Sequence, residues 1–316
     1  MKNKNSRLFV ILGLGILTTL AALGYIRYYI ARPIGSGPAG PAVASEPFAH
    51  PWSDRQVLLI GIGDSVTAGL GAKNASHSYF QRLVENPVDE FADMKGICLS
   101  RVLPNLKTLN LAISGSTSLT HAEVVADRLE MQPTDIYGIV VMTTGGNDLI
   151  HSYGRAPARE GAMFGAEYEE AKPWIANFEI RLNSMLDLIL AKFPGGCEIY
   201  LADIYDPTDG VGDGASIMLK PWPDGLAIHA EYNRVINRCA DARDQVHVVR
   251  LHKTFLGHGG HCRQFWQPFY DSKDPYYWFY DNVEDPNDRG YDAIRRVFMN
   301  SILEHSSLRA KPQASQ

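Results

Sequence analysis

Short apolar runs alternate with longer amphipathic stretches along most of the chain. Runs rich in β-branched residues have the composition of buried strands and lie at residues 57–62, 107–112, 137–142, 198–204 and 246–251. Apolar positions recur at helical spacing in residues 78–94, where Pro87 interrupts, then in 120–131, 168–193 and 228–239, and from 290 onward. This alternation predicts an α/β domain in which helices cover both faces of a parallel five-stranded sheet.

The chain opens with an apolar run of a different kind. Residues 8–26 carry no charged side chain and are long enough to cross a bilayer as a helix. The run exceeds the apolar core of a cleaved signal peptide, although Ala42-Val43-Ala44 is a weak cleavage site and a secreted protein is the alternative. Lys2, Lys4 and Arg7 precede the run, so the positive-inside rule places the N-terminus in the cytoplasm. We therefore expect residues 1–31 to be a membrane anchor and the remainder to be extracytoplasmic, periplasmic or at the cell surface.

A change in composition separates this anchor from the α/β pattern. Residues 32–54 are rich in Pro, Gly and Ala without apolar periodicity, which predicts a flexible or partly extended linker. Strand and helix signals then continue without a second break, so we expect one domain at 55–306 and a polar tail at 307–316. The net charge of -5 provides no basic stripe, which argues against nucleic acid as a partner.

The cysteines leave two readings open. Cys98, Cys197, Cys239 and Cys262 are even in number, and an extracytoplasmic location permits disulfides with three possible pairings. Buried free thiols are the alternative. The spacings match no Cys-x-x-Cys pattern, so no zinc site is expected.

Small polar turns follow the first three predicted strands. They are Gly63-Asp64-Ser65, Ile113-Ser114-Gly115 and Gly145-Gly146-Asn147-Asp148. The carboxyl ends of parallel strands meet at one edge, where ligands bind. A serine at a strand-to-helix turn can expose its hydroxyl and its free N–H, which suits a nucleophile and an oxyanion donor. Taken alone, such a serine is as easily explained as a helix N-cap.

In chain order these blocks resemble the SGNH (GDSL-type) hydrolase family, which has Gly-Asp-Ser, a glycine after the second strand, Gly-x-Asn-Asp and a late Asp-x-x-His. The resemblance runs from about residue 57 to the C-terminal helix and implies a three-layer α/β/α, flavodoxin-like fold. It implies a serine esterase in which Ser65 is the nucleophile and forms an acyl-enzyme. The N–H groups of Ser65 and Gly115 and the Asn147 side chain would form the oxyanion hole. No cofactor is expected.

The fourth block departs from the family pattern. Asn282 occupies the Asp position and Asp285 the His position. An unperturbed aspartate accepts a proton from serine poorly. We therefore expect a relocated base, unless both candidate imidazoles lie far from Ser65 and a carboxylate contacts its hydroxyl, in which case Asp285 is the base.

The long Gly-rich loop after the fifth strand supplies the histidine candidates. His258 is the first choice and His261 the second, and Asp285 or Asp288 would orient the ring. Both histidines could instead be structural. A metal site at His258, His261 and Cys262 lacks a clear fourth ligand. Aromatic residues crowd positions 265–270 and 275–280, where packing of the loop is favoured over substrate contact.

Two functions are compatible with these residues. The first is an esterase acting on a small-molecule or polymer-borne ester, with the membrane as a partner through the N-terminal segment. The second is a hydrolase-like domain that has lost turnover and binds a carbohydrate or acyl ligand. The sequence does not choose between lipid, thioester and carbohydrate esters, and an outward-facing location slightly favours envelope polysaccharide or lipid esters.

Overall fold

The computed structural model describes residues 2–309, with side chains from residue 9 on. Its sheet contains β1 (Gln56–Ile62), β2 (Leu106–Asn110), β3 (Ile136–Met142), β4 (Cys197–Ala202) and β5 (Val246–Val249). The strands pair in parallel in the order β2-β1-β3-β4-β5, which is the flavodoxin-like order. The predicted parallel five-stranded sheet is therefore confirmed.

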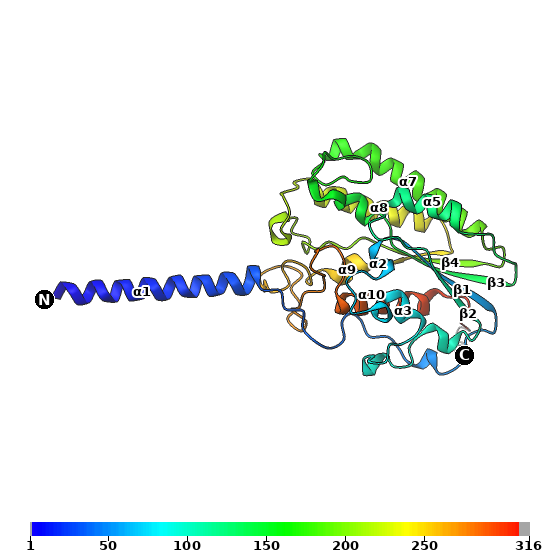
Figure 1. Ribbon diagram of the computed structural model, residues 1–316, viewed down its shortest axis with the longest axis horizontal. Helices are drawn as coiled ribbons and strands as arrows, with labels where there is room; N and C mark the ends of the chain where they lie inside the picture. Colours follow the sequence, from blue (N-terminus) through cyan, green and yellow to red (C-terminus); the bar gives the residue numbers. More distant parts are fainter. Residues whose placement is uncertain (1, 310–316) are drawn as a thin grey trace, which may run out of the picture.

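Helices cover both faces of this sheet (Figure 1). One layer contains α5 (Ser118–Arg128), α7 (Tyr168–Ala191) and α8 (Gly225–Asp241), and the other contains α3 (Tyr79–Val84) and α10 (Asp288–His305). Short α-helices follow the strands or lie in loops: α2 (Ser65–Ala68), α4 (Leu99–Val102), α6 (Gly146–Ile150) and α9 (Leu251–Phe255). The 3₁₀ turns are η2 (Glu46–Phe48), η3 (Ala75–His77), η4 (Ala92–Met94), η5 (His151–Gly154) and η6 (Gly214–Ile217).

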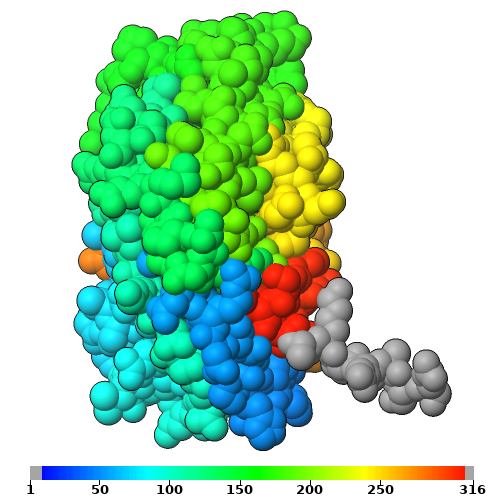
Figure 2. All heavy atoms as spheres, turned by 90° about the vertical axis from the view of Figure 1, so that its right-hand side faces the viewer, coloured from blue at the N-terminus to red at the C-terminus, as the bar shows by residue number. Residues whose placement is uncertain are grey.

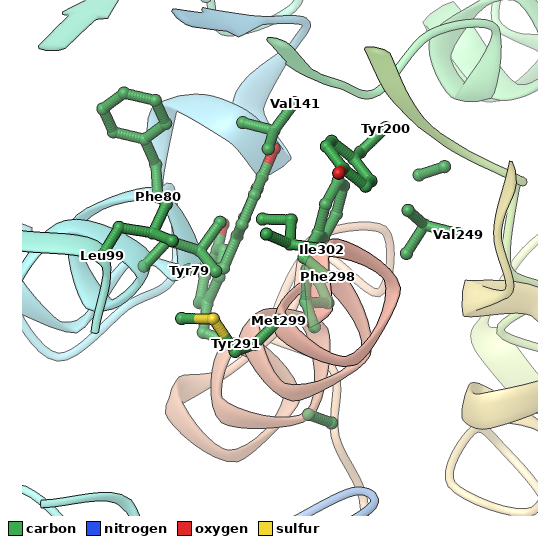
Figure 3. Close-up of a cluster of buried hydrophobic side chains, with 14 of the residues drawn as sticks. Tyr79, Phe80, Leu99, Val141, Tyr200, Val249, Tyr291, Phe298, Met299 and Ile302 are labelled. Atoms are coloured by element: carbon green, nitrogen blue, oxygen red, sulfur yellow. The ribbon is translucent and has the colours of Figure 1, made fainter. Parts of the chain in front are cut away.

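Alternate strand residues pack into two separate cores because successive side chains point to opposite faces. In β3, Val140 packs with the α7 and α8 layer, where the Phe178 and Tyr232 rings stack with centroids 4.3 Å apart. Val141 packs on the opposite side with α3 and α10. Figure 3 shows this second core, in which side chains of α10 face the strands. The two cores hold the sheet rigidly, so the turns at its carboxyl edge have fixed positions.

Buried ion pairs accompany the apolar contacts of α10. The Arg295 guanidinium is fully buried and donates to both carboxylate oxygens of Glu90, at 2.8 and 2.9 Å. It also donates to Asp292 Oδ1 at 2.6 Å. Charges taken out of water must be compensated in this way to avoid a large desolvation cost.

The N-terminal helix α1 (Lys2–Tyr25) projects away from the domain and continues as the π-helix η1 (Ile26–Ile30) (Figure 1). The stretch Phe9–Ile30 has a mean hydropathy of 2.2, and none of its most apolar window is buried in the domain. By length and composition it could cross a membrane, a test that a signal sequence also passes.

Residues 32–54, predicted to be a flexible or partly extended linker, lie against the domain. The Arg289 guanidinium donates to the carbonyls of Ile34, Gly37 and Pro38, and the Ala39 N–H donates to Asp292 at 3.0 Å. These contacts use the backbone of the segment, which explains why its sequence has no apolar periodicity.

The opposite edge of the sheet, where the strands begin, faces the viewer in Figure 2. Residues just before β1 lie there beside the end of α10, and the Trp52 N–H donates to Val102 O at 2.8 Å. Leu308, in the expected tail, is buried, and residues 310–316 lie outside the described part. All four cysteines are free and buried.

Candidate active site

The turn after β1 presents Ser65 as the first residue of α2. A Cβ at Gly63 would lie 2.3 Å from Thr143 Oγ1, so glycine alone allows the turn to approach β3 this closely. The Asp64 carboxylate caps α2 by accepting from the Val66 N–H at 3.1 Å, and it accepts from the Thr143 hydroxyl at 3.0 Å. Ser65 is buried at 6% exposure and lines a cavity at the carboxyl edge of the sheet.

Hydroxyl contacts below this turn keep it in place. Thr67 Oγ1 lies 2.7 Å from the Tyr79 hydroxyl and 2.8 Å from Thr143 Oγ1. They join α2 to α3 and to the end of β3. The hydroxyl of Ser65 is thus carried on a turn fixed from two sides.

The second and third turns are tied together beside Ser65. The Asn147 side-chain amide donates to Ser116 O at 2.8 Å. His121 Nε2 lies 2.7 Å from Ser116 Oγ, and its Nδ1 lies 2.8 Å from Thr144 Oγ1. Burial lowers the pKa of His121 to about 4, so its ring is neutral at pH 7. Asn147 lines the cavity, whereas Gly115 lies on the exposed turn next to Ser116 and is not a lining residue.

Asp148, the last residue of the third block, has a structural role. Its fully buried carboxylate accepts from the Ser118 N–H at 2.7 Å and from the Ser118 hydroxyl. The Tyr232 hydroxyl and the Arg181 guanidinium lie nearby, at 3.4 and 3.6 Å. Asp148 therefore links the start of α5 to α7 and α8.

The carboxyl of Asp285 lines the same cavity as Ser65. Burial raises the pKa of Asp285, and the Ser65 hydroxyl and the Asn282 amide lower it by less. Asn282 Nδ2 donates to Asp285 Oδ2 at 2.5 Å. Asp285 Oδ1 is buried and has no hydrogen-bond partner within the described residues. The Ser65 hydroxyl is thus near enough to affect the pKa of Asp285 without forming an aligned hydrogen bond, as is common at catalytic sites without substrate.

Two further carboxyl groups share the cavity with Asp285. Burial raises the pKa of Asp64 to about 6, and the charge of Asp285 adds to this effect. Burial also raises the pKa of Glu284 to about 7, the charges of Asp285 and Asp64 add to it, and a hydrogen bond with Tyr153 opposes it. Like charges this close disfavour full ionisation, so the three groups titrate as a coupled set.

The loop that carries these acids is held in a strained shape. Val283 is a buried β-branched residue with φ of 62°, a conformation that such residues rarely adopt. Asp285 O accepts from the Tyr280 N–H at 2.7 Å, and Glu284 O accepts from the Tyr205 hydroxyl. Strain of this kind is maintained only where surrounding contacts enforce it, and it gathers at functional sites.

The two histidines expected to serve as the base lie elsewhere. The His258 ring stacks on Trp278 with centroids 3.5 Å apart, and its Nδ1 lies 3.2 Å from Tyr276 O. His261 Nδ1 lies 3.0 Å from Thr208 O, and neither histidine lines the cavity. Asp285, unlike His258 and His261, lines the cavity that contains Ser65. The carboxylate of Asp288, an expected ring-orienting partner, instead contacts His77 and Arg82.

The path of the glycine-rich loop explains this difference. The buried carboxylate of Asp209 accepts from the N–H groups of Gly257, Gly259 and His261, at 2.9, 2.8 and 2.8 Å. These bonds fold the loop against residues 206–213. It therefore does not fold over the Ser65 turn, as a histidine base there would require.

The cavity that joins these groups is mainly apolar. The space open to the centres of water molecules is about 130 Å³, enough for several waters or part of an acyl chain. Apolar and aromatic side chains supply most of its walls beyond the polar end: Val66, Leu149, Ile150, Phe164, Ile204, Tyr205, Ile217, Leu219, Trp222, Leu226, Leu251 and Val283.

Sequence reasoning did not assign roles to Asp64, Glu284, His121 or His229. Asp64 and Glu284 are next in sequence to the assigned residues Ser65 and Asp285, and this proximity is the only sign of a role that the sequence offers. Their raised pKa values come mainly from burial, which depends on the fold. His229 lines the cavity and its Nε2 lies 2.8 Å from Ile204 O. Among the described residues, no group of three or more His, Cys, Asp or Glu side chains could hold a metal ion.

Known proteins resemble this chain in sequence profile and in fold. The profile of the GDSL-like lipase/acylhydrolase family matches residues 62–293. The lipase Lip_vut3 from a goat rumen metagenome is 15% identical with a TM-score of 0.52, and the match covers 80% of this chain and 100% of that chain. A mutant of Axe2, an acetyl-xylooligosaccharide esterase from Geobacillus stearothermophilus, is 15% identical with a TM-score of 0.51, over 79% and 94% of the two chains. No curated protein matches this chain.

Proposed function

The chain belongs to the GDSL-like lipase/acylhydrolase family, which makes it an ester-bond hydrolase, and from this premise we propose that it cleaves carboxylic esters through an acyl-enzyme on Ser65, with Asp285 as the general base. The observation that carries this proposal is that Asp285 lines the cavity with Ser65, whose hydroxyl is near enough to lower the pKa of the Asp285 carboxyl. A base must lie within reach of the proton that it removes, and this proximity supports Asp285 in that role.

The proposed reaction has two steps. In the first, Ser65 Oγ bonds to the ester carbonyl carbon while its proton passes to Asp285. The tetrahedral intermediate then expels the alcohol, which takes that proton as the C–O bond breaks. In the second, water attacks the acyl-enzyme, gives a proton to Asp285 and releases the acid, and the proton returns to Ser65 Oγ.

The oxyanion hole would use donors from three turns. They are the N–H groups of Ser65 and Gly115 and the Asn147 side chain. One Asn147 N–H is occupied by Ser116 O, so the second N–H of the amide would face the oxyanion. The bonds that tie Asn147, Ser116 and His121 together preorganise this donor, which is where such groups gain their strength.

The apolar walls of the cavity support an ester whose acyl group is hydrocarbon. Aliphatic and aromatic side chains make up most of the lining of the cavity that contains Ser65. An acyl chain placed against these walls would leave water, at roughly 25 cal/mol per Å² buried. Placing a highly hydrated acyl group against these walls would be unfavourable, because it would lose water without gaining hydrogen bonds.

Binding without turnover is the alternative function. It is favoured by the positions of His258 and His261, neither of which lines the cavity that contains Ser65. In that case the cavity would retain an acyl ligand, and the raised pKa of Asp285 would reflect burial alone.

Hydrolysis of p-nitrophenyl esters of increasing chain length tests the proposed function. We expect the protein to hydrolyse them and Ser65→Ala to lower kcat by at least about 10³-fold, as when a nucleophile is removed. Equal hydrolysis by both proteins would exclude Ser65, and binding of a fatty acid by both proteins without hydrolysis would support the alternative.

The location of the domain belongs to the same proposal. The apolar stretch Phe9–Ile30 would anchor the protein in a membrane with the catalytic domain extracytoplasmic. Four free thiols are compatible with that location but do not require it.

A further inference from the structure

Exposed aromatic side chains gather where α1 and η1 meet the domain. Phe265, Trp266 and Phe269 expose 61%, 46% and 47% of their surface, and Tyr25 and Tyr29 expose 58% and 52%. These residues are here called the aromatic collar. Large exposed aromatic side chains on one side of a domain mark a contact surface.

The collar consists of two segments that are far apart in sequence but in contact. The centroid of the Tyr29 ring lies 6.0 Å from that of Trp266. The neighbouring Tyr28 ring packs edge-on against Trp266, with centroids 5.3 Å apart. Gln264 Nε2 also donates to Tyr28 O at 3.2 Å. The loop is thus attached to the last turn of the apolar stretch.

The length of the apolar stretch predicts where the aromatic collar would lie relative to a lipid bilayer. Phe9–Ile30 has 22 residues, which as a helix span roughly 30 Å, the thickness of the hydrocarbon core. If this stretch spans a bilayer, its C-terminal turn lies at the headgroup level. Tyrosine and tryptophan side chains concentrate at that level because their rings are apolar and their polar atoms can reach water.

The collar is continuous with the wall of the cavity. A Cβ at Gly210 would lie 3.2 Å from the Phe269 ring, and one at Gly260 would lie 2.8 Å from Ser216 Oγ. The Gly260 N–H donates to the carbonyl of the cavity-lining Pro207 at 2.8 Å. The loop that bears the collar therefore packs on the segment that encloses the cavity.

The catalytic edge of the sheet faces the same way as α1. Figure 1 shows α2 and α9, which follow the carboxyl ends of their strands, on the side of the domain from which α1 leaves. The edge where the strands begin lies on the other side (Figure 1). Trp52 belongs to that edge, since it lies just before β1 and its backbone N–H donates to Val102 O, just before β2.

We propose that the aromatic collar sits in the headgroup region of a lipid bilayer and holds the catalytic edge against that surface. The partner is the bilayer itself, and the inference rests on the proposed insertion of α1. The collar adds a second attachment to the anchor, so the domain does not swing freely on its helix. An ester borne by a membrane amphiphile would then lie beside the mouth of the cavity.

Depth-dependent fluorescence quenching tests this docking on the full chain. The protein is reconstituted in phosphatidylcholine vesicles, recovered by flotation, and compared in lipids brominated at shallow or deep acyl positions. The difference between the emission of the unmodified protein and that of Trp266→Phe gives the contribution of Trp266. The same difference for Trp52→Phe gives the contribution of Trp52, which is the matched control at the opposite edge. Circular dichroism checks that both variants are folded.

We expect shallow bromines to quench Trp266 about twofold or more, with weaker quenching by deep bromines and none of Trp52. Floated protein whose Trp266 is quenched by lipid no more than Trp52 would overturn the docking and leave the anchor intact. Protein that does not float would overturn both the docking and the membrane anchor. Hydrolysis by Ser65 is tested independently, by the p-nitrophenyl ester assay.

Discussion

At the scale of single residues, the site depends on whether an aspartate can do the work of an imidazole. An ordinary aspartate is several pKa units too acidic to accept a proton from serine at neutral pH. Burial raises the pKa of Asp285, and the charge of Asp285 contributes to the raised pKa values of Asp64 and Glu284. Burial thereby moves Asp285 toward the basicity that the reaction needs, and its electrostatic coupling to the two other acids is mutual.

This coupling predicts a pH dependence. A base works only when deprotonated, so kcat/KM should rise with pH through the raised pKa of Asp285; the charge of Asp285 also contributes to raising the pKa of Glu284 to about 7. Glu284→Gln removes one negative charge beside Asp285, so the rise should occur at lower pH. A pH–rate profile measures this shift.

The control is Glu169→Gln, an exposed residue of α7 whose side chain is 78% accessible. Its profile should superimpose on that of the unmodified protein. Identical profiles for Glu284→Gln and the unmodified protein would show that Glu284 does not influence the base.

At the scale of elements, α10 depends on compensated charges as well as apolar packing. Arg295→Ala would leave the buried carboxylate of Glu90 without its guanidinium partner, whereas Asp292 would still accept from Arg296. We expect a loss of about 3–5 kcal/mol in the free energy of unfolding. Chemical denaturation of the protein in detergent, followed by circular dichroism, measures the change.

The matched control for Arg295→Ala is Arg234→Ala, which removes an exposed arginine of α8. Arg234 pairs with Glu231 at 2.5 Å, but its side chain is 59% accessible, so its loss should cost less than about 1 kcal/mol. A comparable loss in both variants would mean that the buried network contributes no more than a surface pair.

The regular elements could be predicted from the sequence because their patterns are local. The apolar run at 137–142 became β3 (Ile136–Met142), and the stripe at 168–193 became α7 (Tyr168–Ala191). The path of residues 256–262 could not be predicted, since it follows from three N–H groups that meet the carboxylate of Asp209. The position of His258 depends on that path.

At the scale of the whole molecule, segments that looked unstructured in sequence determine how the parts are joined. Residues 32–54 pack through their backbone against α10, and the aromatic loop packs on the end of the N-terminal apolar stretch. Sequence patterns identified the anchor candidate and the domain separately. Their relative placement comes from long-range contacts that no local pattern encodes.

Ser65 of the Gly-Asp-Ser block and Asn147 of the Gly-x-Asn-Asp block line the same cavity, because turns after parallel strands share an edge. The sequence placed Asp285 after His258 and His261 as a candidate base. Asp285 ranked last because its raised pKa comes from burial, which only the folded chain determines.

The most direct test of the account is the rate at which a fluorophosphonate labels Ser65, measured by intact mass in the unmodified protein and in Asp285→Asn, His258→Ala and His261→Ala. We expect one adduct on Ser65, a rate at least about 10²-fold lower in Asp285→Asn, and unchanged rates in both histidine variants. Full-rate labelling of Asp285→Asn, or its loss in His258→Ala, would contradict the assignment of Asp285 as the base.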